Sequence, residues 1–186
     1  MLLLVGLGNP GSNYTNTRHN IGFKIIDAIN LHFKLSKQKP KFKGLLTTGN
    51  IDSKKIYAIK PLTFMNNSGT AIKELIDYFK IDAKNVFVFH DDLDIDFGKI
   101  KAKFGGSSAG HNGVESIDKF IGKDYSRVRI GIGKPKGNME IADYVLQNFD
   151  EDELLGIEKI SKDITDSISM LVEKKLDLFS STINNK

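Results

Sequence analysis

Residues 2–33 read LLLVGLGNPGSNYTNTRHNIGFKIIDAINLHF, an apolar run, a long polar loop and a second apolar run. The first run, Leu2–Leu7, is typical of a buried strand, and Arg18–Phe33 spaces its isoleucines along one face of a helix, with Thr17 as the predicted cap. A connection between two core elements normally needs only a few turn residues. The segment Gly6–Asn20 instead supplies four asparagines, a tyrosine, an arginine and a histidine. Because polar loops at strand ends often carry binding and catalytic groups, this segment predicts a functional site.

Strands and helices are expected to alternate along the rest of the chain. The patterns predict a hairpin at 41–50 and 54–60, strands at 86–89, 99–104 and 126–133, and helices at 67–79, 112–121, 141–149 and 152–174. We therefore expect one α/β domain over residues 1–186, with three layers (α/β/α) around a twisted mixed, mostly parallel sheet. The polar C-terminal tail, about residues 180–186, is expected to be frayed.

The composition is that of an ordinary globular protein. The chain has no cysteine, which excludes disulfides, thiolate catalysis and zinc–thiolate sites and fits a reducing cytoplasm. The apolar start, Met1–Leu7, lacks a basic flank and is too short for a signal peptide or a membrane span. We therefore expect a cytoplasmic protein that does not engage a membrane. The net charge of +4 comes mostly from lysines interleaved with acidic residues, as on a solvated surface.

Four polar segments are predicted to meet at one edge of the sheet. They are Asn9–Asn20, Thr63–Ser68, His90–Asp94 and Gly105–Gly113. Each of them follows a strand or precedes a helix. In open α/β sheets, ligands bind in the crevice outside the carboxyl ends of the strands. The convergence of these segments predicts a single site at that edge.

Histidines and acidic residues are the candidates for chemistry. His19 lies in the first turn of its predicted helix, where the helix dipole disfavours a protonated imidazole and so suits a base. The cluster His90–Asp94 (HDDLD) allows a metal site, an acid that orients a distant histidine, or a solvated turn, and the sequence leaves all three open. His111 and Asn112 stand at the entry to a helix, and Asn112 is its predicted cap.

Amide and basic side chains complete the set of candidates. Three separate polar loops each carry an asparagine, namely Asn9, Asn66 and Asn112. A carboxamide donates and accepts hydrogen bonds without charge, so three of them could grip a peptide or ester group. Two strands carry basic residues at a period of two, which places each row on one face: Lys99, Lys101 and Lys103, and Arg127 and Arg129. Such rows contact phosphates or protect a sheet edge, and both interpretations remain open.

Two alternative functions fit parts of this sequence. Gly6–Gly11 matches G-x-G-x-x-G after a strand, which would indicate a dinucleotide-dependent oxidoreductase. That motif requires a helix that opens at the third glycine, whereas Pro10–Asn13 is typical of a turn and the helix is expected only near Thr17. A non-catalytic RNA-binding module is the second alternative. Titration with NAD(P) tests the first, and RNA binding without any catalysis is the mark of the second.

Taken together, the motifs resemble those of the bacterial peptidyl-tRNA hydrolase family. The resemblance runs in order through VGLGNPG (5–11), YTNTRHNIG (14–22), KPLTFMNNSG (60–69), HDDLD (90–94), GHNG (110–113), RVRIGIG (127–133) and DYVL (143–146). These elements span most of the first 150 residues, and TRHN and GHNG are the most specific. Two positions depart from the family pattern. Glu115 stands where the family usually carries a base, and Ser107–Ala109 varies a tolerant loop.

The resemblance implies a fold, an activity and a set of site residues. The fold is a single α/β domain, typically monomeric, and the activity is hydrolysis of the ester that joins a peptide, or an N-blocked aminoacyl group, to the terminal ribose of tRNA. By position, His19 is the general base, Asp91 its orienting acid, and Asn9 the third catalytic residue. The substrate- and tRNA-binding positions are Tyr14, Phe64, Asn66, Asn112, Lys103 and Arg129. No metal and no cofactor are expected. No G-x-S-x-G elbow or cysteine suggests a covalent intermediate, and water activated by one base is adequate for an ester.

Overall fold

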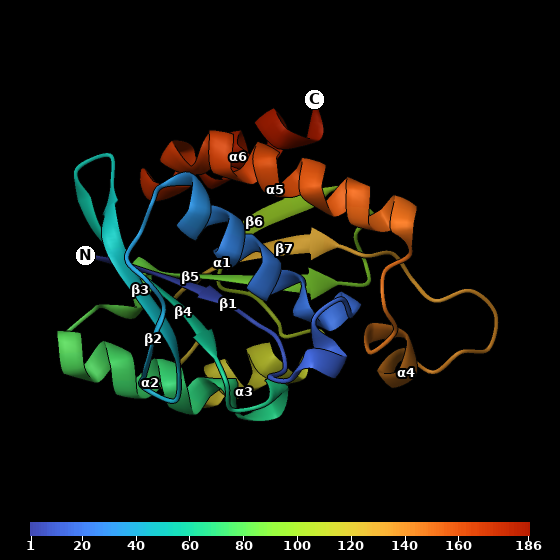
Figure 1. Cartoon of the computed structure of the whole chain (residues 1–186), viewed down its shortest axis with the longest axis horizontal. Helices are drawn as coiled ribbons and strands as arrows, with labels where there is room; N and C mark the ends of the chain where they lie inside the picture. The colour runs from blue at the N-terminus through green and yellow to red at the C-terminus, as the bar shows by residue number, and fades with distance from the viewer.

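The computed structural model describes residues 1–186 and contains one seven-stranded sheet, with the strand order β2-β3-β4-β1-β5-β7-β6 (Figure 1). Its four central strands are parallel: β4 (Lys54–Pro61), β1 (Leu2–Gly6), β5 (Val86–Asp92) and β7 (Ser126–Gly131). Antiparallel pairs add β3 (Gly44–Ile51) and β2 (Lys39–Lys41) beyond β4, and β6 (Ile100–Phe104) beyond β7. The predicted mixed, mostly parallel sheet is confirmed.

Helices cover both faces of the sheet, which gives the three predicted layers (Figure 1). One face carries α1 (Ile21–His32), α5 (Glu151–Val172) and α6 (Leu176–Asn184), and the other carries α2 (Ser68–Phe79) and α3 (Asn112–Ile121). Each face has its own apolar core. In β1, Leu2 and Leu4 belong to the first core, whereas Leu3 and Val5 belong to the second. A central strand buried on both sides has to be apolar at every position, as the run of leucines is.

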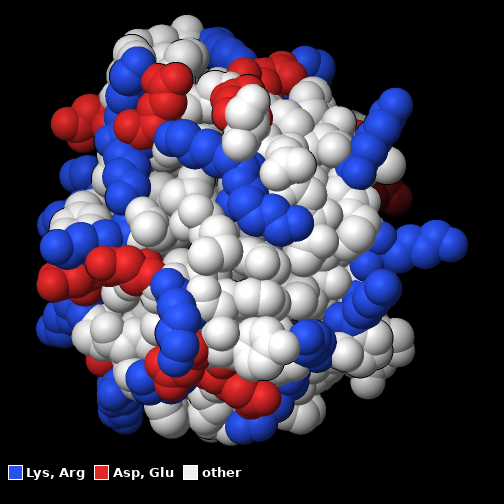
Figure 2. All heavy atoms as spheres, turned by 90° about the vertical axis from the view of Figure 1, so that its left-hand side faces the viewer, with Lys and Arg blue, Asp and Glu red and all other residues white.

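The carboxyl ends of the parallel strands meet at one edge of the sheet, on the right in Figure 1. The connections at this edge include the single turns Ser12–Tyr14, Arg18–Asn20 and Met65–Asn67, and the short helix α4 (Ile141–Val145). Figure 2 shows the opposite end of the molecule, where basic and acidic side chains are interspersed around an uncharged centre. Charges of mixed sign at that end agree with a solvated surface.

Several predicted boundaries differ from the structure, and three of these differences bear on the site. The helix predicted from Arg18 starts as a tight turn, Arg18–Asn20, and becomes α1 only at Ile21. Thr17 does not cap it, because its hydroxyl donates to the carbonyl of Tyr14 instead. β5 continues to Asp92, so the acidic cluster begins inside a strand rather than after it. The helix predicted over 141–149 ends at Val145, because the chain then pairs with the segment that carries Thr17.

Close packing accounts for the glycines of the first loop. A Cβ atom on Gly6 would clash with the carbonyl oxygen of Gly22, and one on Gly8 would clash with the ring of Phe23. These glycines let α1 approach the end of β1, which places the turn Arg18–Asn20 beside β5. Since α1 opens at Ile21, ten residues after Gly11, no helix begins at the third glycine. The dinucleotide interpretation therefore has no structural support.

The prediction of a frayed tail was wrong. Residues 176–184 form α6, and its Phe179 and Ile183 are buried. Polar side chains of α6 bind the free edge of β6: the amide of Asn184 exchanges two hydrogen bonds with the backbone of Ile100, and Ser180 accepts one from Ala102. An unpaired strand edge is prone to aggregation, and α6 covers this one.

No helix of this structure combines the length and the apolar character that crossing a membrane requires.

Candidate active site

Two side chains that lie 72 positions apart in the sequence meet at the carboxyl edge of the sheet. Nδ1 of His19, from the turn before α1, is 2.9 Å from Oδ1 and 2.8 Å from Oδ2 of Asp91, near the end of β5. Both residues are buried. A carboxylate only accepts, so Nδ1 carries the proton and donates it. The remaining ring nitrogen of His19, Nε2, makes no hydrogen bond and keeps a free lone pair.

A second histidine contacts the same carboxylate. Nε2 of His111 is 2.8 Å from Oδ1 of Asp91, and its Nδ1 accepts the backbone N–H groups of Gly113 and Val114 at 3.1 and 3.3 Å. Because Nδ1 is an acceptor, the proton of this ring lies on Nε2 and points at Asp91. His111 is therefore a fixed hydrogen-bond donor and not a base.

His111, and not Asn112, is the residue that caps α3. The predicted cap was wrong in this detail, although the bounds of α3 match the predicted helix. The GHNG motif carried a signal for this position, since a histidine directly before a helix can accept from the first N–H groups. Imidazole caps are uncommon beside those of serine, threonine, aspartate and asparagine, so propensity favours the wrong neighbour.

His90 packs behind this pair. Its Nδ1–H donates to the backbone carbonyl of Asp91 at 2.8 Å, and its ring lies edge-on to that of His111 at 4.9 Å. Burial, assisted by the neighbouring His111, lowers the pKa of His90 to about 3. The ring is neutral at physiological pH, and its Nε2 is buried without a partner.

The charge of Asp91 is set by its neighbours. Burial acts to raise the pKa of Asp91, but the imidazoles of His19 and His111 outweigh it and hold that pKa well below its usual range. Asp91 is therefore an ionised acceptor at the centre of the site. An ionised carboxylate on Nδ1 stabilises positive charge on His19 when Nε2 takes up a proton.

These groups line a cleft of about 600 Å³. Its walls come from the end of β5, the loop before α3, and the segment that follows β7. That segment, residues 134–149, is called the strap below; its Lys134, Pro135, Ile141, Ala142 and Val145 face the cleft. Asn112 also lines the cleft. Tyr14, Phe64 and Asn66 do not, although the turn that holds Asn66 packs on α3.

Asn9 is held rigidly by hydrogen bonds, but it does not line this cleft. Its backbone N–H and carbonyl form hydrogen bonds of 2.8 and 2.9 Å with the amide of Asn20, and its Oδ1 accepts the N–H of Met65 at 2.8 Å. With the oxygen occupied, Nδ2 is left as a free donor. Asn9 lines a separate hollow of about 340 Å³ beside Phe23 and Lys60.

The other predicted contact residues lie near the surface of the same edge. Tyr14 is half-buried, whereas Phe64, Asn66 and Asn112 are exposed. Phe64 has a φ angle of 59°, in the left-handed region that residues with side chains rarely adopt. Its ring stands in solvent and is available for contact with a partner.

The two predicted basic rows differ in how far their side chains are exposed. Arg127 is buried, where it pairs with Asp118 at 2.8 Å and donates to the carbonyl of Ser107. It therefore supports the fold. Lys101 and Lys103 are exposed on β6, directly opposite Arg129 and Arg127 of β7. Since β6 is an edge strand covered by α6, protection of the edge does not by itself require these lysines.

Arg129 keeps only part of its guanidinium free. Its Nε donates to Oδ2 of Asp92 at 2.7 Å, and its side chain remains 23% exposed. A guanidinium carries five N–H donors, so the pair with Asp92 leaves others for a phosphate.

The metal-site interpretation of the acidic cluster fits this geometry poorly. The ligand atoms of His19, Asp91 and His111 lie within 4.8 Å of one another. However, a metal on Nε2 of His111 needs that nitrogen unprotonated, which would move the proton to Nδ1 and against two backbone N–H groups. Asp92 is occupied by Arg129. The relay interpretation fits the observed contact of His19 with Asp91 and requires no change in the proton positions of either histidine.

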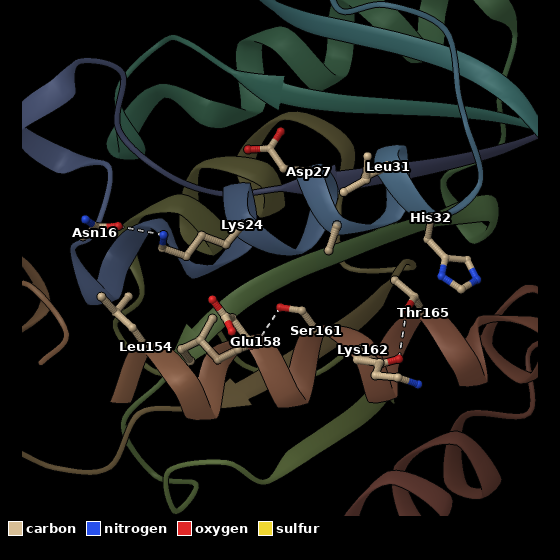
Figure 3. A pocket seen from close by; sticks show the side chains of 12 residues that line it. Asn16, Lys24, Asp27, Leu31, His32, Leu154, Glu158, Ser161, Lys162 and Thr165 are labelled. Carbon is tan, nitrogen blue, oxygen red and sulfur yellow. Dashed lines mark hydrogen bonds between the residues drawn. The ribbon is translucent and has the colours of Figure 1, made fainter. Parts of the chain in front are cut away.

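A larger hollow of about 770 Å³ lies between α1 and α5, away from these groups (Figure 3). Its side chains are partly satisfied within the chain, since Lys24 donates to Asn16 and Ser161 to the carbonyl of Ile157. It also carries charges of both signs, including Asp27, Glu158 and Lys162 (Figure 3). The histidines of the carboxyl edge thus remain the group that is organised for chemistry.

Comparisons with known proteins agree over the whole chain. A sequence profile of the family described as peptidyl-tRNA hydrolase matches residues 3–186. The chain is 73% identical to a peptidyl-tRNA hydrolase of Pelagibacter ubique over all of both sequences, and 46% identical to one of Ehrlichia canis over 98% of this chain and 94% of that one.

A solved structure shares the fold. The chain superposes on peptidyl-tRNA hydrolase from Acinetobacter baumannii with a TM-score of 0.91 and 33% identity, over 99% of this chain and 94% of that one. A 5′-methylthioadenosine nucleosidase of Arabidopsis thaliana has a TM-score of 0.53 at 8% identity, which shows likeness of fold alone. By sequence along its full length and by structure, the chain belongs to the peptidyl-tRNA hydrolase family.

Proposed function

We propose that the chain cleaves the ester between a peptide, or an N-blocked aminoacyl group, and the 3′-terminal ribose of tRNA, with His19 as general base. The family to which the chain belongs hydrolyses peptidyl-tRNA. One observation carries the assignment of the base. His19 holds its Nδ1–H on the buried carboxylate of Asp91 and leaves Nε2 free at the wall of a cleft.

The reaction proceeds by direct attack of water. Nε2 of His19 takes a proton from a water molecule, whose oxygen bonds to the ester carbonyl carbon and gives a tetrahedral oxyanion. Collapse of this intermediate breaks the bond to the ribose oxygen, which receives the proton from the imidazolium. The products are a peptide carboxylic acid and tRNA with a free terminal hydroxyl. General base catalysis of this kind is typically worth about 10²–10⁴ in rate.

Asn9 supplies a fixed neutral donor in this scheme. Its side-chain oxygen, Oδ1, accepts the N–H of Met65, so the position of Nδ2 is fixed without rotation of the amide. A preorganised donor is most effective where charge develops, because no reorganisation is needed during the reaction. We assign Nδ2 of Asn9 to the carbonyl region of the substrate, either at the oxyanion or at the blocked amino group.

Basic residues on β6 and β7 bind the tRNA backbone in this proposal. Lys103 is exposed on β6, and Arg129 has free N–H donors on the adjacent β7. Contacts to phosphates supply affinity without reading bases, which suits an enzyme that accepts many tRNAs. Tyr14, Phe64, Asn66 and Asn112 contact the 3′ end and the acyl group. We further propose a monomeric, cytoplasmic enzyme that needs neither metal nor cofactor.

One assay tests the reaction. N-acetylated and free aminoacyl-tRNA are incubated with the protein in EDTA, and ester cleavage is followed. We expect cleavage of the blocked substrate only. Binding of tRNA without cleavage would favour a non-catalytic RNA-binding module, and a requirement for NAD(P) would favour the oxidoreductase.

A variant tests the base. His19→Ala should lower kcat by about 10²–10⁴ with little change in KM. Turnover near that of the wild type would remove His19 from the role. Asp91→Asn is the companion variant: it keeps the shape of the side chain but loses the charge that stabilises the imidazolium, so kcat should fall here also.

A further inference from the structure

Arg18 is a buried cation directly before His19, and the proposed chemistry does not use it. Only 8% of the residue is exposed. Its Nη2 contacts both carboxylate oxygens of Glu153 at 3.2 and 3.1 Å, and its Nη1 donates to the carbonyl of Asn148 at 3.2 Å and that of Gln147 at 3.4 Å. Burial of a charge is costly unless it is paired. A planar fork meets these acceptors together, whereas an ammonium group cannot.

All these partners belong to one segment of the chain. Gln147 and Asn148 lie near the end of the strap, and Glu153 lies in the first turn of α5 just after it. The guanidinium of Arg18 also lies over the ring of Tyr144, in α4, at 4.3 Å from the centroid. The other side of the strap lines the cleft. Arg18 therefore connects the turn that carries His19 with the wall that faces it.

Backbone hydrogen bonds also tie the turn Arg18–Asn20 to the strap. The N–H of Arg18 donates to the carbonyl of Gln147 at 3.0 Å, and the N–H of Phe149 donates to the carbonyl of Asn16 at 2.9 Å. On the other side of His19, the side chain of Asn20 holds the backbone of Asn9. The ring of His19 thus stands between two anchored residues, one tied to the strap and one tied to the loop after β1.

We propose that Arg18 is a positioning residue for hydrolysis. Through Glu153 and the end of the strap, it keeps the turn Arg18–Asn20 in register with the cleft wall, so that the His19 ring remains on Asp91 when substrate fills the cleft. This proposal rests on the role of His19 as base. A misplacement of about 1 Å can cost roughly 100-fold in rate, so a residue that only positions can have a large kinetic effect.

The test replaces the guanidinium and keeps the charge. Arg18→Lys should lower kcat on N-acetyl-aminoacyl-tRNA by at least about tenfold, while KM changes less than about twofold, since the residues proposed to bind the tRNA backbone lie on β6 and β7 and do not contact Arg18. In the proton NMR spectrum, the Nδ1–H signal of His19 should shift or broaden, while the Nε2–H signal of His111 remains. A kcat and a His19 signal like those of the wild type would overturn the proposal.

A matched control separates positioning from simple loss of stability. Asp150→Ala removes the cap of α5, where the Asp150 carboxylate accepts the N–H of Glu153, but leaves the contacts of Arg18 in place. It should lower Tm without lowering kcat at a temperature where the protein is folded. An equal fall of kcat in Asp150→Ala and Arg18→Lys would show that any loosening of this helix start suffices, and the proposal would fail.

A second variant tests the same contact in case Arg18→Lys does not fold. Glu153→Gln keeps an oxygen acceptor for Arg18 but removes the charge, so kcat should fall by a smaller factor, about threefold. An unchanged kcat would contradict the proposal. The two proposals fail in different experiments. The role of His19 as base is contradicted by turnover of His19→Ala near that of the wild type, whereas the positioning role of Arg18 is contradicted by an unchanged kcat in Arg18→Lys or Glu153→Gln.

Discussion

Nε2 of His111 donates a hydrogen bond of 2.8 Å to the same Asp91 oxygen that lies 2.9 Å from Nδ1 of His19. The two histidines are neighbours on one carboxylate, with ring centroids 4.8 Å apart, yet only one of them can act as a base. Backbone N–H groups at the start of α3 occupy Nδ1 of His111 and leave it no free lone pair. The start of a helix thus decides which imidazole is available for proton transfer.

Separate substitutions distinguish the two roles of His111. His111→Asn keeps a helix cap but loses the donor to Asp91, so it should lower kcat by roughly tenfold with little change in Tm. His111→Ala loses both and should also destabilise the protein by about 1 kcal/mol. Steady-state kinetics and thermal melts of the two variants check this. Full activity in His111→Asn would mean that the hydrogen bond to Asp91 has no part in orienting the carboxylate.

His90 makes stability depend on pH. In the unfolded chain a histidine binds a proton below about pH 6.5, whereas the pKa of native His90 is about 3. The unfolded state therefore binds more protons between these values, and stability falls as the pH drops from 6.5 toward 3. The expected loss approaches about 1.4 kcal/mol per pH unit for this one group. Asp91 acts in the same direction as the pH falls through its usual titration range and below it, because its native pKa is depressed.

The contribution of His90 can be measured by substitution. His90→Asn retains an N–H for the carbonyl of Asp91 but has no titrating group in this range. We expect urea unfolding of both proteins from pH 7 to pH 4 to show a smaller slope of unfolding free energy against pH in the variant. The difference in slope should correspond to the uptake of at most one proton. Parallel curves would show that His90 does not contribute to the pH dependence.

Lys103 and Arg129 are expected to contribute to affinity and not to chemistry. Lys103→Ala and Arg129→Gln should each raise KM for tRNA substrates and leave kcat within about twofold, and each should reduce the slope of log K against log salt by about one. Asp92→Asn is the control, because it releases Arg129 from its ion pair without removing a cation. An unchanged KM and salt slope in Lys103→Ala would argue against a phosphate at that position.

The last helix is expected to contribute strongly to stability. Phe179, in α6, is fully buried against the core, so Phe179→Ala should destabilise the protein by about 3–5 kcal/mol. Leu178, its neighbour, is 49% exposed, and Leu178→Ala should change stability by less than about 0.5 kcal/mol. Urea unfolding at pH 7 compares the two. Equal effects would mean that α6 does not pack as described.

Local pattern was sufficient for most elements of the fold. The apolar run of β5 and the helical spacing of α2 and α3 appear in short windows of sequence, because period and burial are recorded in neighbouring residues. The same patterns failed where a distant contact decides. α6 looked like a polar tail because its buried residues, Phe179 and Ile183, are few, and its polar side chains gain their partners only from β6.

The candidate site was likewise predictable from the sequence only in part. His19, Asp91 and Asn9 could be named as candidates through motifs that resemble those of a known family, since each motif is a short run of unusual residues. Their mutual geometry could not, nor could the fate of Arg127, which shares a face with Arg129 by period but is buried against Asp118. Exposure on a strand depends on which helix covers it, and period alone cannot say that.

The order of residues alone determined the α/β architecture and the polar edge, because strand and helix periods are properties of neighbouring residues, and its motifs supplied the candidate reactive groups through their resemblance to a known family. The tertiary structure alone decided which histidine keeps a free nitrogen, which carbonyl and carboxylate groups hold Arg18, and which cations remain exposed. The physical reason is that a proton position or a buried charge is fixed by its hydrogen-bond partners, and here those partners come from segments up to 135 positions away.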